Sequence, residues 1–423
     1  MKRFLGIAFL VAVASAALYA YVVTRQETWY LEVIEQGDAA LAREDTFAAI
    51  EAFSVAVAMK PDSMAGHLKR GEAYRRRGQF DSAIRDLRRA AELDPLAPQP
   101  REILGDVHAA MGDATAAAER YTEYLGLDDR APRVLYKLTV TQLEGGQPAV
   151  AAATLQRALK LDDRFAEAHY LLGVCLNEVQ RAAQAVGPLE KALELNPGLL
   201  QAREELAAVY GRLHRHDQQQ RQLELLAGLD PRASREVAVA LAYARDGRAD
   251  RAVLRLRNAS RAFPDDNQTH TALGRLALGG SEPMAAAEVS RALDALEAAT
   301  AENPTSEALT LYGRALMASG QLSRAQKVLA DATSRFPVDS LAFYYLADVA
   351  ERRGRIRVAQ RALLDYAALE GIASPHLSAG VLARIAEAHL TAGNQSAAWD
   401  AAERALKKDP ANAQALLVWA RLR

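Results

Sequence analysis

A spacing of 34 residues recurs along this 423-residue chain and limits the folds that it can adopt. Prolines mark one station of the period, at Pro61, Pro95, Pro197, Pro231, Pro264, Pro304, Pro337 and Pro410. A second station holds Ala49, Ala83, Ala117, Ala151, Ala185, Gln219, Ala252, Ala292, Ala325, Ala359 and Ala398. A fixed period of this length is typical of arrays of like-sized supersecondary units, and the second series predicts eleven of them.

Within one period the residue types suit two antiparallel helices joined by a turn. Small residues at fixed positions let two helices approach to about 8–10 Å, while larger side chains fill the space beside them. In residues 64–95 the small residues are Gly71, Ala83 and Ala90, and the larger ones are Tyr74 and Leu87. A turn glycine, which suits the left-handed residue that ends a helix, recurs as Gly78, Gly112, Gly146, Gly247, Gly320, Gly354 and Gly393.

The composition agrees with a helical array and excludes several kinds of site and partner. Aromatic residues make up only 6% of the chain, and Ala, Leu and Val dominate its hydrophobic half, which favours close-packed helices over a sheet. The single cysteine, Cys175, excludes an intramolecular disulfide and a four-cysteine zinc site. A formal net charge of -1 argues against nucleic acid as the main partner.

The spacing of Gly, Tyr, Ala, an aromatic residue or Leu, Ala and Pro over 34 residues resembles the tetratricopeptide repeat, over about residues 28–410. The resemblance implies an all-α solenoid, a right-handed superhelix of about eleven helix-turn-helix repeats whose first helices line a concave groove. Such grooves usually bind peptide segments or other proteins, and no enzymatic activity belongs to the repeat itself. Residues 411–423, with Leu416, Leu417 and Trp419 on one side, are expected to form a C-terminal capping helix.

The first 25 residues differ from the array. Residues 4–23 carry no charge, and a helix of this length reaches about 30 Å, the thickness of the hydrocarbon core of a bilayer. We therefore expect residues 1–25 to form one membrane-spanning anchor. Lys2 and Arg3 precede the run, so the positive-inside rule places the array in the periplasm, at the inner membrane of a bacterium. The alternative is a signal peptide cleaved at Ala14-Ser15-Ala16, which leaves a soluble periplasmic protein.

Family positions projected onto the first helices give a set of candidate binding residues on the concave face. They are Glu72, Arg75, Glu102, Asp106, Tyr136, Tyr170, Asn177 and Glu204. Their chemistry is mixed, and they lack the Lys and Asn pattern with which such repeats clamp a C-terminal carboxylate. An exposed tyrosine in a concave surface can anchor a peptide, or it can pack against the next repeat.

Two further stretches stand out by charge or polarity. Basic residues gather in repeat two, from Lys69 to Arg89, where they could face anionic headgroups or an acidic partner. The acidic residues interleaved among them favour an ordinary charged helical face. Repeat six has Gln219 where alanine belongs and a polar turn from His214 to Gln220. We expect the two helices of that repeat to pack more loosely than those of its neighbours.

No zinc-protease histidine pair, Gly-rich phosphate loop or nucleophile elbow is present in the sequence. We therefore expect no catalytic site, no metal and no cofactor. The leading hypothesis is a membrane-anchored scaffold or adaptor for proteins of bacterial envelope assembly, such as export, pilus or polysaccharide machinery. The alternative is a non-catalytic regulatory subunit of an enzyme that makes glycan or lipopolysaccharide. The sequence leaves the oligomeric state open.

Overall fold

The computed structural model describes residues 2–279, 286–371 and 374–423, except for the side chains of residues 2–14, 16, 286 and 288. These residues form 23 α-helices and no β-strand, which confirms the all-α prediction. The chain divides into two compact units, residues 1–215 (unit 1) and 216–423 (unit 2). The division falls in the turn of repeat six, the repeat that we expect to be loosely packed.

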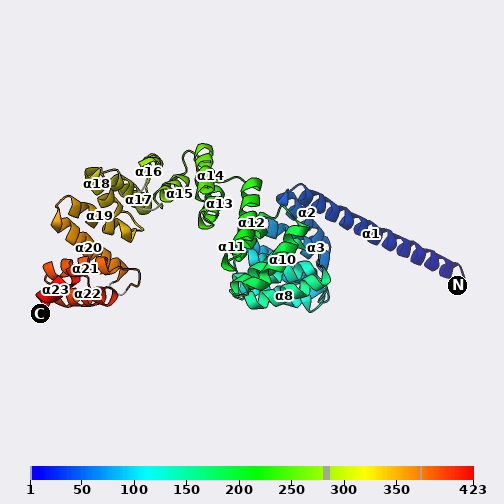
Figure 1. The fold of residues 1–423 in the computed structure, drawn as a ribbon. Helices are drawn as coiled ribbons and strands as arrows, with labels where there is room; N and C mark the ends of the chain where they lie inside the picture. Colours follow the sequence, from blue (N-terminus) through cyan, green and yellow to red (C-terminus); the bar gives the residue numbers. More distant parts are fainter. Residues whose placement is uncertain (1, 280–285, 372–373) are drawn as a thin grey trace. The chain divides into compact units, whose positions relative to one another are not determined.

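Eleven helices lie in unit 1 (Figure 1). They are α1 (Lys2–Ala42), α2 (Thr46–Met59), α3 (Met64–Arg76), α4 (Phe80–Leu93), α5 (Gln99–Ala110), α6 (Ala114–Leu125), α7 (Pro132–Glu144), α8 (Pro148–Leu161), α9 (Ala166–Glu178), α10 (Ala182–Leu195) and α11 (Leu200–Arg212). From α1 to α10 each odd-numbered helix packs on the next to form one repeat, and each even-numbered helix packs on the first helix of the following repeat. Unit 1 is therefore a solenoid of helix pairs.

The described part of unit 2 holds twelve helices of the same kind. They are α12 (His216–Leu229), α13 (Ala233–Arg245), α14 (Ala249–Ala262), α15 (Asn267–Leu278), α16 (Ala286–Ala299), α17 (Ser306–Ala318), α18 (Leu322–Ala332), α19 (Ser340–Arg352), α20 (Ile356–Glu370), α21 (Ala379–Thr391), α22 (Gln395–Lys408) and α23 (Ala413–Leu422). The first helices α13, α15, α17 and α19 contact one another in sequence, and α23 packs on both α21 and α22. The last helix thus closes the final repeat.

Glycine on the first helix sets how closely two helices of a repeat approach. A Cβ atom at Gly71 would lie 2.8 Å from Cγ of Leu87, and one at Gly173 would lie 2.4 Å from Cγ of Leu189. Both distances are too short for a real Cβ atom, so the leucine occupies the space that a larger residue would need. Ala83, Leu87 and Ala90 are fully buried at this contact in repeat two. The predicted role of the small residues is confirmed.

The predicted turn glycines all adopt the left-handed conformation. Their φ angles run from +68° at Gly354 to +81° at Gly393. Repeats one, five and six place Glu44, Gln180 and His214 at this station instead, with φ of 61°, 63° and 55°. A residue with a Cβ atom pays about 1–2 kcal/mol for this conformation, whereas glycine does not.

Replacing Gln180 with glycine is therefore expected to stabilise unit 1 by about 1 kcal/mol. The matched change is Gly112→Ala, which places a Cβ atom at the same station of repeat three, where no atom lies within 4 Å. It should destabilise the unit by a similar amount through the backbone alone. Urea denaturation of both variants checks the pair, and equal signs for the two changes would contradict the explanation.

Histidines recur at one station of the repeat and fasten the loop before the first helix. His67, His169 and His270 each place Nε2 near the carbonyl oxygen of the residue six positions earlier, at 3.0, 2.9 and 2.9 Å. In repeat six Arg203 takes this role and donates to the carbonyl of Pro197 at 2.9 Å. In these four repeats a backbone carbonyl at the end of the preceding repeat thus obtains a side-chain partner.

The first helix, α1, runs without a break from the predicted anchor into repeat one, since no Gly or Pro stands between Arg25 and Tyr30. Tyr30, Val33 and Ala40 are buried in the first repeat. Among the residues described, no helix is long and apolar enough to cross a membrane. Most side chains of the run 4–23, on which the anchor prediction depends, lie outside the described residues.

Candidate protein-binding surface

The eight candidate residues lie on the first helices α3, α5, α7, α9 and α11 of unit 1. α3 contacts α5, and α9 contacts α11. Side chains on neighbouring first helices can therefore interact across repeats. The structure brings seven of the eight into two groups and buries the eighth.

A lysine on α7 joins two of the predicted carboxylates on α5. Nζ of Lys137 donates to Oε1 of Glu102 at 2.7 Å and to Oδ2 of Asp106 at 2.8 Å. The hydroxyl of Tyr121, on α6, donates to Oδ1 of Asp106 at 2.7 Å. We call these four residues and Arg75 the charged ladder, because they link repeats two, three and four.

Two arginines hold the carboxylate of Glu72 at the other end of the ladder. Arg75 donates to both carboxylate oxygens, at 2.7 and 2.8 Å, and Nε of Arg76 donates to Oε1 at 2.8 Å. Burial alone would raise the pKa of Glu72, but the hydrogen bonds from Arg75 and Arg76 outweigh it, so the pKa is lowered. Glu72 is therefore ionised at neutral pH and already paired.

Electrostatics connect these groups from one repeat to the next. The hydrogen bond to Glu72 is the main cause that raises the pKa of Arg75, and the charge of Asp106 adds to it. Burial, followed by the hydrogen bond to Asp106, raises the pKa of Tyr121. The charged residues of the ladder thus pair with one another. A binding partner would meet a polar surface whose positive and negative charges largely cancel.

The second group is formed by Tyr136, Tyr170 and Glu204. Tyr136 packs on Phe165, with ring centroids 5.0 Å apart and planes inclined by 36°. Burial raises the pKa of Tyr170, and the nearby charges of Glu205 and Glu204 and the neighbouring Tyr136 add to this effect. Both tyrosines are half-buried, whereas Glu204 is exposed. This group offers aromatic area beside negative charge.

Asn177 does not line the surface, because its side chain is buried and the residue is only 1% exposed. Its amide nitrogen donates to Oε1 of Glu205 on the next first helix, and its Oδ1 has no hydrogen-bond partner among the described residues. The residue thus connects two repeats from inside. The family pattern therefore selects a position that does not face a binding partner here, because Glu205 of the next repeat binds the side chain of Asn177.

The sequence analysis did not identify Lys137 and Tyr121 as site residues, although the spacing between Lys137 and an earlier aspartate could have indicated the lysine. Asp106 and Lys137 are 31 residues apart, and so are Asp38 and Lys69, which pair at 2.7 Å in repeats one and two. An acidic residue followed by lysine 31 residues later joins two neighbouring first helices. Together with the pairs of Glu72, this shows that much of the basic stretch in repeat two is an ordinary, paired helical face.

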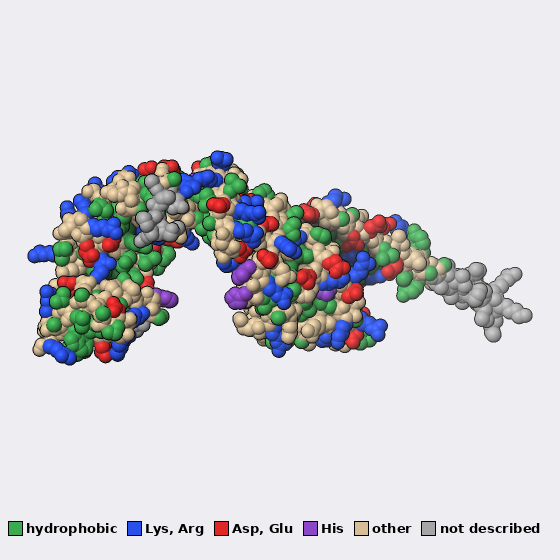
Figure 2. All heavy atoms as spheres, viewed as in Figure 1, with side chains coloured by type: hydrophobic (Ala, Val, Ile, Leu, Met, Phe, Trp, Pro, Cys, Tyr) green, Lys and Arg blue, Asp and Glu red, His purple; other side chains and the backbone are tan. Residues whose placement is uncertain are grey.

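Unit 2 carries an aromatic cluster that sequence reasoning also missed. On α19 the rings of Tyr344 and Tyr345 meet edge to face, with centroids 5.2 Å apart. Arg314 lies over Tyr345 at 5.1 Å and Arg384 over Tyr344 at 5.5 Å. Arg384 also pairs with Glu351 at 3.0 Å. Acidic and basic side chains are interspersed elsewhere over the face that Figure 2 shows.

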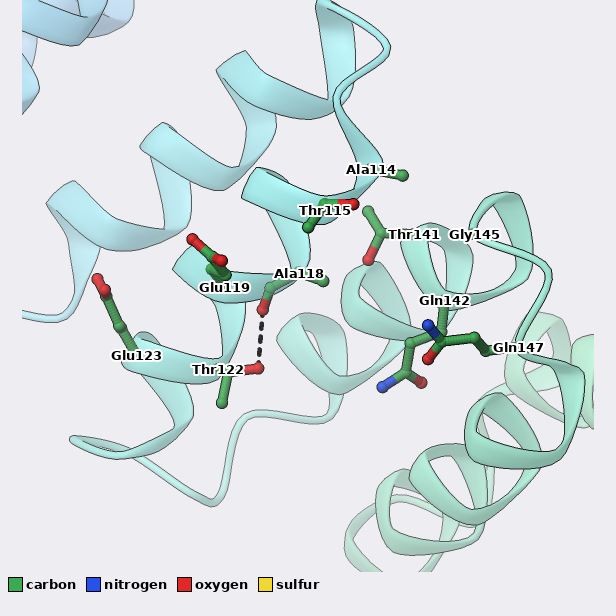
Figure 3. A pocket seen from close by; sticks show the side chains of 10 residues that line it. All are labelled: Ala114, Thr115, Ala118, Glu119, Thr122, Glu123, Thr141, Gln142, Gly145 and Gln147. Carbon is green, nitrogen blue, oxygen red and sulfur yellow. Dashed lines mark hydrogen bonds between the residues drawn. The ribbon is translucent and has the colours of Figure 1, made fainter.

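A separate pocket of about 450 Å³ lies in unit 1, between α6 and the turn from α7 to α8 (Figure 3). Thr115, Glu119 and Thr122 line it from α6, and the amides of Gln142 and Gln147 lie together on the other side. Oε1 of Gln142 is buried and finds no hydrogen-bond partner in the part of the chain that the structure describes. No Cys, His, Lys or Arg lines the pocket, so it offers hydroxyl, amide and carboxylate groups.

Other reactive or metal-binding groups are sparse in the described part of the chain. No group of three or more His, Cys, Asp or Glu residues there could hold a metal ion. Cys175 is fully buried, and burial raises the pKa of its thiol to about 11. A thiol in this state is a packing residue.

Removal of Lys137 tests the ladder. Lys137→Met leaves Glu102 and Asp106 close together without their common cation, and we expect a loss of about 2 kcal/mol in the stability of unit 1, because these side chains are partly buried. The control, Lys191→Met, removes an exposed lysine that pairs with Glu194 at 3.0 Å, and it should cost less than about 1 kcal/mol. Urea denaturation gives both values, and equal losses would show that the ladder is merely a surface feature.

The geometry defines a class, an all-α solenoid of helix pairs with polar and half-buried aromatic side chains on its first helices. Two models of one family, the Tetratricopeptide repeat, match this chain. One covers residues 34–98, 68–132 and 136–199, and the other covers residues 284–349. The chain therefore belongs to the tetratricopeptide repeat family, whose repeats mediate protein–protein interactions.

Several individual proteins are similar to parts of this chain. Small glutamine-rich tetratricopeptide repeat-containing protein 2 of Mycosarcoma maydis is 33% identical over 88 residues, which are 21% of this chain and 23% of that protein. The chain thus spans about a quarter of the length of that relative. The C-terminal part of a TPR repeat-containing protein from Cytophaga hutchinsonii is 16% identical, with a TM-score of 0.51 over 57% of this chain and 99% of that one.

A third similar structure is pilF of Pseudomonas aeruginosa. It is 22% identical and covers 49% of this chain and 94% of that chain, with a TM-score of 0.40. Both structural likenesses have low identity, and the Cytophaga structure supports the fold alone.

Proposed function

We propose that this protein is a non-catalytic adaptor that is tethered to the bacterial inner membrane by residues 4–23 and binds segments of envelope-assembly proteins in the periplasm. The binding surface is the group of Tyr136, Tyr170 and Glu204, bordered by the charged ladder. The observation that carries the binding role is the half-buried aromatic pair on adjacent first helices. Such rings supply apolar contact area at low conformational cost, and aromatic residues are frequent in binding hot spots.

The composition of this surface limits the partner. The charges of the ladder are already paired, so long-range attraction of a charged tail contributes little there. The tyrosines favour a segment with an apolar side chain next to a hydrogen-bonding one. An extended or helical peptide that spans repeats four to six would contact both rings.

The tether is supported by the N-terminal part of α1. Within the uncharged run, five large apolar residues are exposed: Leu18, Tyr19, Tyr21, Val22 and Val23. Trp29 is also exposed and follows Arg25 within one turn or so. A continuous set of exposed apolar residues with an aromatic residue and a charge at its end suits a helix that leaves a bilayer there.

Fractionation of cells tests the tether. The chain should sediment with membranes and stay there in high salt, whereas Val13→Arg/Ala17→Arg should release it, because each arginine costs about 2.5–3.5 kcal/mol at the centre of a spanning helix. The control Leu416→Arg/Leu417→Arg places the same charges on exposed leucines of α23 and should keep the chain on membranes. Protease should digest the array in spheroplasts but not in intact cells.

Two results would contradict the tether. A soluble wild-type chain whose N-terminus begins just after Ala16 would support the cleaved signal peptide instead. Digestion that requires opening of the inner membrane would place the array on the cytoplasmic side and remove the periplasmic proposal.

Site-specific photocrosslinking tests the binding surface. A photoreactive phenylalanine analogue in place of Tyr170 should yield discrete products with envelope proteins in intact cells, identified by mass spectrometry. The control position is the exposed Gln156 on α8, a second helix that carries none of the candidate residues. Identical products at both positions, or none at Tyr170, would contradict the surface. Products dominated by one glycan or lipopolysaccharide synthase would favour a regulatory subunit over a scaffold.

A further inference from the structure

Repeat seven, in unit 2, is the most basic part of the chain. Residues 232–262 hold eight arginines, three acidic residues and no lysine, although the whole chain has a formal net charge of -1. The arginines are Arg232, Arg235, Arg245, Arg248, Arg251, Arg255, Arg257 and Arg261. Blue side chains gather in Figure 2 over the stretch that Figure 1 labels α13 and α14. Such an excess of one charge is a local property of this repeat.

The five arginines outside the exposed face of α14 all have partners. Arg232 and Arg235 pair with Asp230 at 2.9 and 2.6 Å, and Arg248 pairs with Asp246 at 3.0 Å. The guanidinium of Arg255 pairs with Glu236 on α13. Arg245 donates to Oε1 of Gln219 at 2.7 Å. These contacts hold α12, α13 and α14 together and account for five of the eight arginines.

Three arginines on the exposed face of α14 are different. Arg251, Arg257 and Arg261 are exposed, and none forms an ion pair with any residue in the described parts of the chain. Their charges add, since no carboxylate neutralises them in place. Each guanidinium is free to offer its fork of donors to a carboxylate from another molecule.

An apolar side chain lies among these three charges. Residues 251, 254, 258 and 261 follow one stripe of the helix at the i, i+3, i+7 and i+10 positions, and residue 257 lies next to it. Leu254, in the middle of the stripe, is 59% exposed. The opposite face, with Ala252, Leu256 and Ala259, is buried in the repeat. The exposed face therefore presents Leu254 next to Arg251 and Arg257, which have no ion pair among the described residues, with the exposed Asp250 and Asn258 also beside the leucine and Arg261 one turn further along.

We propose that this face of α14 binds an acidic segment of a partner protein, with carboxylates on Arg251, Arg257 and Arg261 and an apolar side chain on Leu254. Charge complementarity selects the acidic partner, and burial of the leucine supplies contact that salt does not screen. This surface lies on unit 2 and on a second helix, so it goes beyond the proposed function, whose surface lies on first helices of unit 1.

Two other anionic partners fit the face less well. A helix that lies on a membrane inserts its apolar face, but the apolar face of α14 is used in the core. Single-stranded nucleic acid usually stacks its bases on aromatic side chains, and the stripe of Arg251, Leu254, Asn258 and Arg261 has none. An acidic protein segment needs only guanidinium groups and one apolar contact, which the face supplies.

The probe for this proposal is a fluorescein-labelled 16-residue peptide of Glu, Asp and Leu, with leucines three and four residues apart. Its binding to the full chain is followed by fluorescence anisotropy at low and physiological salt. Arg251→Gln/Arg257→Gln/Arg261→Gln should weaken binding at least tenfold, and Leu254→Ser should weaken it about threefold. Binding of the wild-type chain should fall as salt rises, since exposed charges are screened.

The control removes the same charge elsewhere in unit 2. Arg352 and Arg361 are exposed and Arg404 is half-buried, and they pair with Asp348, Asp365 and Asp400 at 2.9, 3.2 and 3.0 Å. Their triple change to glutamine should alter binding less than twofold. Circular dichroism of all variants confirms that each remains folded, as expected for surface changes.

Several results would overturn the proposal. They are absence of peptide binding at 100 μM, equal loss in the control and test variants, and undiminished affinity for a peptide in which serine replaces every leucine. Vesicles of phosphatidylcholine and phosphatidylglycerol at 70:30 and a 20-nucleotide oligothymidine serve as competitors. If either binds more tightly than the peptide and loses its affinity in the test variant, the face is a membrane or nucleic-acid surface instead.

Discussion

Replacing Arg70 with methionine is expected to destabilise unit 1 by about 3 kcal/mol, because it leaves the buried carboxylate of Asp86 without its main cation. Arg70 donates to both oxygens of Asp86, at 2.6 and 2.8 Å, and Nδ1 of His67 lies 3.1 Å from Oδ1. Asp86 is only 7% exposed. The hydrogen bond to Asp86 is also the main cause that raises the pKa of Arg70.

A double-mutant cycle separates the lost pair from the stranded charge. Arg70→Met/Asp86→Leu removes both charges and should recover most of the loss, since well-packed apolar residues often replace a buried ion pair without cost. The control Arg361→Met breaks an exposed pair with Asp365 and should cost less than about 1 kcal/mol. Urea denaturation of the wild type, Arg70→Met, Asp86→Leu, the double variant and the control gives the free energies of unfolding that the cycle needs. A single change at Arg70 that costs no more than the control would mean that water solvates Asp86 adequately.

This contact has a consequence for the binding surface. Arg70 and Glu72 lie on α3, and Asp86 lies on α4. The ion pair therefore fixes the helix that carries Glu72 and Arg75 at one end of the charged ladder. Loss of the pair should loosen repeat two first, and hydrogen exchange of α3 and α4 should rise more than that of α9 and α10.

Replacing Gly313 with alanine is expected to destabilise unit 2 by about 2 kcal/mol, although alanine is normally the better helix former. A Cβ atom there would lie 2.4 Å from Cγ and 2.5 Å from Cδ2 of Leu329. Leu329 is fully buried in the largest apolar cluster of the unit. Either this leucine leaves its rotamer or α17 and α18 move apart, and both options lose packing.

The same substitution at Gly380 should have the opposite sign. Gly380 lies in the first turn of α21, and a Cβ atom there would meet nothing within 4 Å. Gly380→Ala should therefore stabilise the unit by about 0.5 kcal/mol, because it reduces the freedom of the unfolded chain. Urea denaturation of both variants measures the difference. If both changes stabilise the protein, the contact between α17 and α18 is more tolerant than its distances imply.

Much of the helical framework was predictable because its determinants repeat within one period. The alanine series anticipates the paired helices, and the glycines from Gly78 to Gly393 anticipate the left-handed turns. The close contact of Gly71 with Leu87 also follows from spacing, since both belong to one helix pair. These features depend on residues fewer than 34 positions apart, where helix geometry leaves little choice.

The candidate surface was less predictable because it depends on side chains from different repeats. Family positions select Glu72, Arg75, Glu102 and Asp106 as candidates, but they do not reveal that Lys137 joins Glu102 to Asp106. Nor do they reveal that Asn177 is buried against Glu205. The long side chains of Lys, Arg and Glu reach several partners, and the tilt between repeats decides which one they meet.

The sequence by itself determined the repeating helix pair, the turns that end each first helix and the small residues at the pair contact, because local backbone preference and periodic burial fix them. Only the tertiary structure decided which charges are neutralised and which remain available. The ladder in repeats two to four is internally paired, whereas Arg251, Arg257 and Arg261 have no ion-pair partner in the described chain. Charge pairing depends on separations of a few ångströms, and a one-dimensional pattern does not contain them.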